Sequence, residues 1–196
     1  MDDLRPYSAV VLAGGRAARL GGQAKPQLQV GGRTMLATVL AAVADAERRV
    51  VVGPPQPVPD GVDLVREQPP GGGPVAALRA GLPGVRSDVV AVLAGDLPFL
   101  LPSLVTQLRA ALSGDGVLVV DDGGRDQYLL GVWRTDALRA AVSAEGAPTS
   151  LRRVLAPLAA DRLRPAVPPG TPPPWLDCDT PADLARARAV AAGLDG

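Results

Sequence analysis

The sequence predicts an α/β protein whose three layers are built around a doubly wound, mostly parallel sheet. Apolar runs alternate with helical patterns through the first half of the chain, which is typical of proteins that wind a parallel sheet. The runs Val50–Val52 and Val89–Leu93 are apolar on successive residues, as expected of strands that helices cover on both faces. Ligands of such sheets bind beyond the carboxyl ends of the strands, so function is expected in the segments that follow these runs.

Apolar periodicity and turn residues predict the remaining elements in order. Strands are expected near 8–13, 48–53, 62–66, 88–94, 116–120 and 127–133. Helices are expected near 34–45, 74–82, 101–112, 135–143, 149–156 and 181–192. Glycine and proline concentrate at boundaries, which are predicted loops, such as 54–59, 69–74 and 165–174. Because the chain has no internal repeat and no long linker, residues 1–196 are expected to form one domain.

Composition narrows the classes of function. The 20 basic and 20 acidic side chains give a net charge of zero, and thus no general attraction to nucleic acid or to an anionic membrane. The first apolar run is interrupted at Gly14, far short of the ~20 residues that span a bilayer. We therefore expect a soluble, cytoplasmic protein with a small-molecule partner. The single cysteine, Cys178, agrees with a reducing compartment.

The sequence contains no histidine, which removes the usual general base and every imidazole metal site. Carboxylates remain as metal ligands. Because oxygen ligands favour Mg²⁺ over zinc, Mg²⁺ is the expected cofactor.

A glycine-rich loop with three cations follows the first strand. Glycines there allow the backbone amides to face a ligand, and the cations offset phosphate charge, so the loop suits a polyphosphate, although a glycine pair is also common in ordinary turns. The loop matches neither the dinucleotide fingerprint nor a Walker loop, because the third glycine and the glycine-lysine-hydroxyl sequence are missing. The candidate phosphate-binding residues are Leu12, Ala13, Gly14, Gly15, Arg16, Arg19 and Lys25.

The stretch LAGGRAARLGGQAKPQLQVGGRTML at 12–36 resembles the opening of the MobA-like nucleotidyltransferases, L-A-G-G-x-S-x-R-M-G-x-x-K followed by L-x-x-x-G-x-P-L-L. The resemblance implies a Rossmann-like nucleotidyltransferase fold and a loop that wraps a nucleoside triphosphate. It further implies that Arg19 and Lys25 contact the phosphates. Two departures are visible, since Ala17 or Ala18 stands where the family often has serine and Ala24 stands where it has aspartate.

An acidic turn ends the strand near 88–94, where Asp96 is followed by Pro98. An aspartate at this place also serves as an ordinary turn or helix cap. The segment AGDLPF resembles the family's C-D-x-P-F motif, whose aspartate holds the magnesium of the triphosphate. The resemblance therefore implies that Asp96 is catalytic, with Lys25 and Arg19, and that it is a metal ligand.

The segment WLDCDTPADLARA at 175–187 is similar to the family's N-x-N-T-P-E-D-L segment. Thr180, Pro181 and Asp183 have the pattern of a helix start, which a structural role explains. By the resemblance, Asp179 completes a Mg²⁺ site with Asp96, and Asp177 stays open as the alternative.

Further segments resemble the parts of the family that contact the base and the acceptor. Gly73 and Pro74 match a G-P-L-A-G loop that lies against the nucleobase, although proline after glycine is also an ordinary helix start. Gln127 and Arg152 are candidate acceptor-binding residues, with a surface hairpin and a solvated helix face as the alternatives.

The resemblance implies Mg²⁺-dependent transfer of GMP from GTP to the phosphate of the molybdopterin cofactor, with release of pyrophosphate. A phosphate monoester is largely ionised at neutral pH because its second pKa is ~6, so a chain without histidine suits this reaction. Proteins that receive the finished cofactor would be further partners. The alternatives are cytidylyl or other nucleotidyl transfer to a phosphorylated small molecule, a catalytically silent nucleotide-binding regulatory protein, and a purely structural α/β domain.

Overall fold

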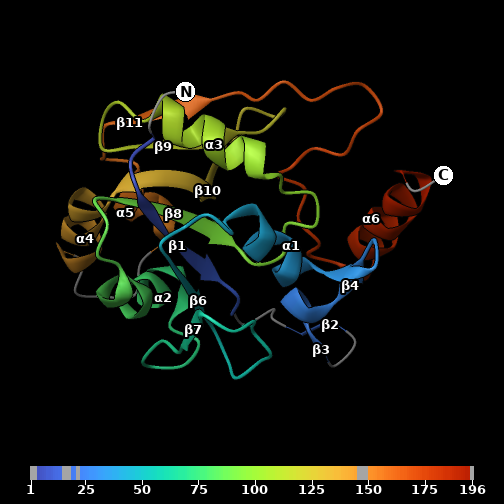
Figure 1. Ribbon diagram of the computed structural model, residues 1–196, viewed down its shortest axis with the longest axis horizontal. Helices are drawn as coiled ribbons and strands as arrows, with labels where there is room; N and C mark the ends of the chain where they lie inside the picture. The colour runs from blue at the N-terminus through green and yellow to red at the C-terminus, as the bar shows by residue number, and fades with distance from the viewer. Residues whose placement is uncertain (1–3, 15–18, 21–22, 145–149, 195–196) are drawn as a thin grey trace.

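The computed structural model describes residues 4–14, 19–20, 23–144 and 150–194. A seven-stranded sheet in the order β11-β9-β10-β8-β1-β6-β7 forms its centre (Figure 1). Its strands are β1 (Tyr7–Leu12), β6 (Arg48–Val52), β7 (Val62–Val65), β8 (Val89–Ala94), β9 (Gly116–Val120), β10 (Asp126–Arg134) and β11 (Ala160–Leu163). Two short hairpins lie apart from it, formed by β2 (Arg19–Leu20) with β3 (Gln23–Ala24) and by β4 (Gln29–Val30) with β5 (Arg33–Thr34).

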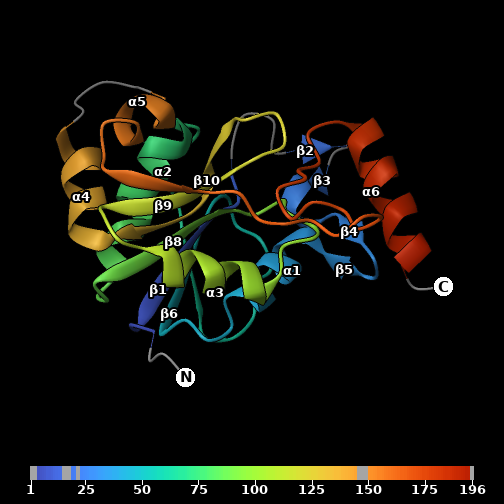
Figure 2. The same cartoon turned by 90° about the horizontal axis from the view of Figure 1, so that it is seen from above.

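Helices cover both faces of the sheet, which confirms the predicted doubly wound architecture. The helices are α1 (Met35–Ala42), α2 (Gly73–Gly81), α3 (Pro102–Ala111), α4 (Thr135–Ala144), α5 (Leu151–Leu155) and α6 (Pro181–Leu194). In Figure 2, α1 and α3 lie on one face and α2, α4 and α5 on the other. Successive side chains of β1 point to opposite faces of the sheet. Ala9 and Val11 pack in the cluster under α1 and α3, whereas Val10 packs under α2 and α4.

The sheet is mostly parallel, as predicted, but one central strand is reversed. β1 runs parallel to β6 and β8, β6 runs parallel to β7, and β9 runs parallel to β11. β10 is antiparallel to both β8 and β9. The edge strand β11 was not predicted from the sequence, because its four residues, ADRL, include two exposed polar ones and form no apolar run.

The chain after β11 crosses to the far side of the molecule (Figure 2). It runs without regular structure to α6, which packs beside β4. Leu184, Ala187 and Ala191 of α6 form a small third core with Leu28 and Val30, which follow the glycine loop. This packing brings the C-terminal acidic segment next to the N-terminal loop.

Candidate active site

Lys25 lies at the centre of an ion-pair cluster built from three distant parts of the chain. Its side chain is 7% exposed, and its ammonium Nζ lies 2.6 Å from Asp96 Oδ2 and 2.5 Å from Asp179 Oδ1. Lys25 opens the short 3-10 helix η1 (Lys25–Gln27), Asp96 follows β8, and Asp179 precedes α6. The structure therefore brings together three of the residues that the sequence singled out.

The chain places Asp96 beside the glycine loop by passing close to the end of β1. Gly95 N donates a hydrogen bond of 2.9 Å to Leu12 O. A Cβ on Gly95 would lie 3.1 Å from the Cβ of Ala13 and 3.2 Å from Leu12 O, a tighter approach than side chains normally make. Glycine at 95 thus allows the approach, and the carboxyl ends of β1 and β8 meet as the topology requires.

Asp179 is placed by the start of α6. Thr180 Oγ1 accepts a hydrogen bond of 3.1 Å from Asp183 N, and Asp183 Oδ2 accepts one of 2.9 Å from Thr180 N. This reciprocal cap confirms the predicted helix start and fixes the chain one residue after Asp179. The preceding residue, Cys178, is fully buried, and burial raises the pKa of its thiol to about 11, so the thiol stays protonated at neutral pH.

Electrostatics at the cluster favour a charged lysine. Burial lowers the pKa of Lys25, but the hydrogen bonds and charges of Asp179 and Asp96 outweigh it, and the net shift is upward. Asp177 shows the opposite situation, because burial and the neighbouring carboxylates of Asp179 and Asp96 raise the pKa of its carboxyl group. The site thus carries more carboxylate than its single lysine offsets.

A cavity of about 270 Å³ opens beside the cluster. It lies where β8 and β10 meet the segment before α6, and it is lined by Ala94, Asp96, Leu97, Gln127, Tyr128, Leu129, Leu130, Trp175, Asp177 and Asp179. A second cavity, of about 580 Å³, shares four of these residues, namely Gln127, Trp175, Asp177 and Asp179. Together they provide room for a small molecule next to Asp96.

Gln127 lines both cavities, whereas Arg152 lines neither. The side-chain amide Nε2 of Gln127 donates a hydrogen bond of 2.9 Å to Asp121 Oδ2. In the β9 to β10 pairing, Gln127 faces Val119 and Gly131 faces Leu118, so three additional residues of β10 lie between them. Those residues, 128–130, line the smaller cavity. Arg152 is exposed on α5.

The glycine loop is described only in part. Leu12 and Ala13 are buried at the end of β1, and a Cβ on Gly14 would lie 3.3 Å from Gly53 Cα. Gly15 and Arg16 lie outside the described residues, and for Arg19 only the backbone, in β2, is described. The phosphate contacts expected of these residues therefore stay predictions.

The predicted base loop begins α2, where Gly73 has φ +85° and Pro74 follows in the first turn. It is tied to the preceding turn by Glu67, whose Oε1 accepts a hydrogen bond of 3.0 Å from Gly71 N and lies 3.8 Å from a Cβ built on Gly14. Glu67 is 7% exposed. Sequence reasoning missed this buried carboxylate, because no periodic pattern sets it apart from neighbouring loop residues. Tyr128 and Trp175 lay within segments that resemble the family, but the sequence assigned no role to either residue.

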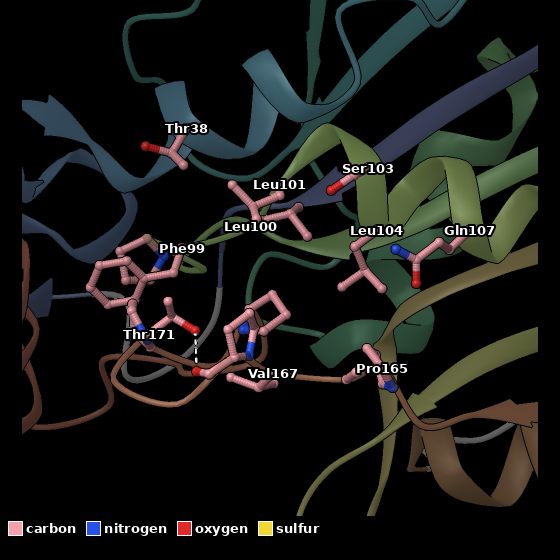
Figure 3. A pocket seen from close by; sticks show the side chains of 15 residues that line it. Thr38, Phe99, Leu100, Leu101, Ser103, Leu104, Gln107, Pro165, Val167 and Thr171 are labelled. Carbon is pink, nitrogen blue, oxygen red and sulfur yellow. Dashed lines mark hydrogen bonds between the residues drawn. The ribbon is translucent and has the colours of Figure 1, made fainter. Parts of the chain in front are cut away.

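A third cavity, of about 370 Å³, is apolar and holds none of the predicted site residues. Figure 3 shows Leu100, Leu101 and Leu104 on one side of it and Pro165 and Val167 on the other. The described residues that line it include no ionisable side chain. Ionic chemistry is therefore expected at the Lys25 cluster instead.

The fold and this cluster define the class of protein. A mostly parallel sheet whose first strand ends in a glycine-rich loop, with a lysine and two carboxylates at that end, is an α/β arrangement suited to a nucleoside triphosphate. The family model of the MobA-like NTP transferase domain matches residues 9–163, and the chain belongs to this family. It is a nucleotidyltransferase.

A curated relative agrees with this assignment, and solved structures share the fold. A molybdenum cofactor guanylyltransferase from Bradyrhizobium sp. is 32% identical over 203 residues, covering 95% of this chain and 93% of the relative. Molybdopterin-guanine dinucleotide biosynthesis protein A from Archaeoglobus fulgidus shares the fold with TM-score 0.69 and 18% identity, covering 95% of this chain and 99% of that chain. The 2-C-methyl-D-erythritol 4-phosphate cytidylyltransferase from Thermus thermophilus matches with TM-score 0.68 and 23% identity over the same shares.

A search of the described residues for membrane-spanning segments found no helix with the length and apolar character needed to cross a bilayer.

Proposed function

We propose that the chain transfers GMP from GTP to the phosphate of molybdopterin, releasing pyrophosphate. The observation that carries the proposal is the meeting of Lys25 with Asp96 and Asp179 at the carboxyl end of β1 and β8, next to two cavities. A molybdenum cofactor guanylyltransferase at 32% identity over almost the whole chain supports this choice of substrates.

In the proposed reaction, an oxygen of the acceptor phosphate attacks the α-phosphorus of GTP, and the bond to the pyrophosphate oxygen breaks. The acceptor phosphate is largely ionised at neutral pH, since its second pKa is ~6, so no general base is needed. Catalysis then rests on positioning and on offsetting charge. Lys25 and Arg19 bind the phosphates, and Leu12 to Arg16 supply backbone amides and a further cation around them.

Asp96 and Asp179 would hold Mg²⁺. Among the residues that the structure describes, no three Asp, Glu, His or Cys side chains form a metal-binding group. The carboxylate pair still fits, because Mg²⁺ in nucleotide sites takes one or two carboxylates together with substrate phosphates. When bound, Mg²⁺ supplies positive charge against the phosphate oxygens. Asp177 lines both cavities and is the alternative ligand.

The remaining proposed roles concern the base of GTP and the acceptor. The base of GTP lies against Gly73 and Pro74, and the acceptor enters the cavities on the side of Gln127. Trp175 lines both cavities and offers an aromatic face to a heterocycle. Arg152 binds the acceptor phosphate only if the acceptor extends beyond the lining of these cavities.

The test is pyrophosphate release by the purified protein with molybdopterin and each of GTP, CTP, ATP and UTP, with Mg²⁺ or EDTA. We expect pyrophosphate release only in the reaction that contains both GTP and Mg²⁺. Release with CTP would make the protein a cytidylyltransferase. Nucleotide binding without release, measured in parallel by thermal shift, would indicate a catalytically silent nucleotide-binding protein.

A further inference from the structure

The ammonium group of Lys25 contacts both carboxylates that we propose as metal ligands. Lys25 Nζ lies 2.6 Å from Asp96 Oδ2 and 2.5 Å from Asp179 Oδ1, so it bridges the two acids. The lysine side chain is 7% exposed and that of Asp96 is 20% exposed, so water screens their contact weakly. Asp179, at 67% exposure, closes the bridge from the solvent side.

The bridge restricts what else binds there. A divalent cation at the same carboxylates would lie close to the Lys25 ammonium, and like charges at that separation repel strongly when they are partly buried. Lys25 would also lose two charge-assisted hydrogen bonds on moving away, unless another anion accepted them. The phosphates of a nucleoside triphosphate carry such oxygens.

We propose that Asp179 is a positioning residue that, with Asp96, holds Lys25 in the place of the divalent cation, so that the cation enters only together with a triphosphate. The inference rests on the proposed function in one respect, namely that the ligand is a nucleoside triphosphate. The metal ion and Lys25 then compete for the same two carboxylates. The metal ion binds them only after the Lys25 ammonium has moved to phosphate oxygens of the triphosphate.

The isosteric variant Asp179→Asn tests this role. The amide cannot form the ion pair, so Lys25 is released toward phosphate while one metal ligand is weakened. With EDTA present, GTP should bind at least 5-fold more tightly than to the unmodified protein. With Mg²⁺ present, GTP should bind at least 5-fold more weakly. Calorimetry measures both constants, and weaker or unchanged binding under both conditions would overturn the proposal.

Asp122→Asn is the matched control, because Asp122 is an exposed residue that lines the larger cavity, and the change removes one negative charge there. It should leave both constants within 2-fold. If it reproduces the gain in metal-free binding, general charge near the cavity explains that gain, and the positioning role of Asp179 is wrong.

Lys25→Met provides a second measurement that uses no nucleotide. Mn²⁺, a paramagnetic substitute for Mg²⁺, should bind the variant at least 10-fold more tightly than the unmodified protein, as measured by electron paramagnetic resonance of the free ion. Equal affinity for the two proteins would disprove the exclusion. If the variant does not fold, the Asp179→Asn comparison still decides the question.

These binding measurements need no acceptor, so they separate the two proposals. Suppose that Asp179→Asn binds GTP more tightly with EDTA and more weakly with Mg²⁺, but that the protein transfers no GMP to molybdopterin. The proposed function would then be wrong, and the positioning role of Asp179 would stand. If the protein transfers GMP but Asp179→Asn does not change GTP binding in these opposite directions, the proposed function stands and the positioning role is wrong.

Discussion

The two halves of the central sheet differ in how regularly their strands pair. In the half formed by β7, β6, β1 and β8, parallel strands pair without any break in register and carry mainly apolar side chains. In the half formed by β10, β9 and β11, the register shifts between Gln127 and Gly131. An ion pair joins strands in each half, between Arg48 of β6 and Asp63 of β7 in the first and between Arg162 of β11 and Asp126 of β10 in the second. Arg162 of β11 donates two hydrogen bonds of 2.9 Å to the Asp126 carboxylate of β10.

This difference matches the roles that we propose for the two halves, namely phosphate and metal binding in the first and acceptor binding in the second. The parallel half presents Asp96 just after the buried strand β8, and Lys25 of η1 reaches that end of the sheet from the segment after β1. The other half forms the acceptor cavities from an irregular strand that charged side chains hold in place. We therefore expect changes in the first half to act on catalysis itself, and changes in the second to act more weakly, on acceptor binding and on acid stability.

The largest effect is expected from Asp96→Asn. The change removes a carboxylate that contacts Lys25 and that we propose as a metal ligand. Pyrophosphate release should fall by about 10²–10³-fold, the range found when one preorganised electrostatic group is removed from an active site. Asp60→Asn, a change at an exposed residue that lines none of the three cavities described above, should keep its activity within 2-fold. Undiminished release from the Asp96 variant would exclude that carboxylate from catalysis.

Lys25→Ala should have the next largest effect. It removes a charge-assisted contact to the phosphates, which is worth about 1.5–3 kcal/mol, or about 10- to 150-fold in the KM for GTP. Steady-state kinetics with varied GTP measures this change, while the KM for the acceptor should stay the same. A change confined to the acceptor KM would move Lys25 to the other half of the site.

The sequence predicted the parallel half better than the other half. The strands predicted near 8–13 and 88–94 contain the unbroken apolar runs 9–13 and 89–94, and the structure has strands at Tyr7–Leu12 and Val89–Ala94. In the second half, β11 is an edge strand with two exposed polar residues and gave no such signal. The direction of β10 follows from a hairpin after β9, where Gly124 has φ +77°. That hairpin was recognised only as an alternative explanation for Gln127.

The candidate site depended on a resemblance more than on periodicity. Lys25 and Asp179 are 154 residues apart in sequence, and no local pattern reports a contact of that range. The motif match placed both near the triphosphate, and the structure brings them together. It covered Tyr128 and Trp175 but gave neither a role, and both line the cavity, from an irregular strand and a loop. Their positions are set by tertiary packing, which one sequence does not display.

Arg162→Gln tests whether the ion pairs of the second half position the acceptor. The guanidinium holds Asp126, one residue before Gln127, so losing it should loosen the start of the irregular segment. Because exposed pairs contribute about 1 kcal/mol or less, we expect a rise of about 2- to 5-fold in the acceptor KM. The KM for GTP should not change, and an equal rise for both substrates would show that the two halves are not independent.

The smallest effect is expected in acid, and it again concerns Asp126. Its hydrogen bonds from Arg162 hold the pKa of this carboxyl below its ordinary value of 3.8. The charged form therefore stabilises the fold above that value, and this contribution is lost as the pH falls through the folded-state pKa. Asp126→Asn should lower the melting temperature at neutral pH, and the difference from the unmodified protein should shrink below about pH 4. Thermal unfolding across this range measures it. A difference that stays constant with pH would mean that Asp126 acts through packing, and the two halves of the sheet would then differ less than their contacts indicate.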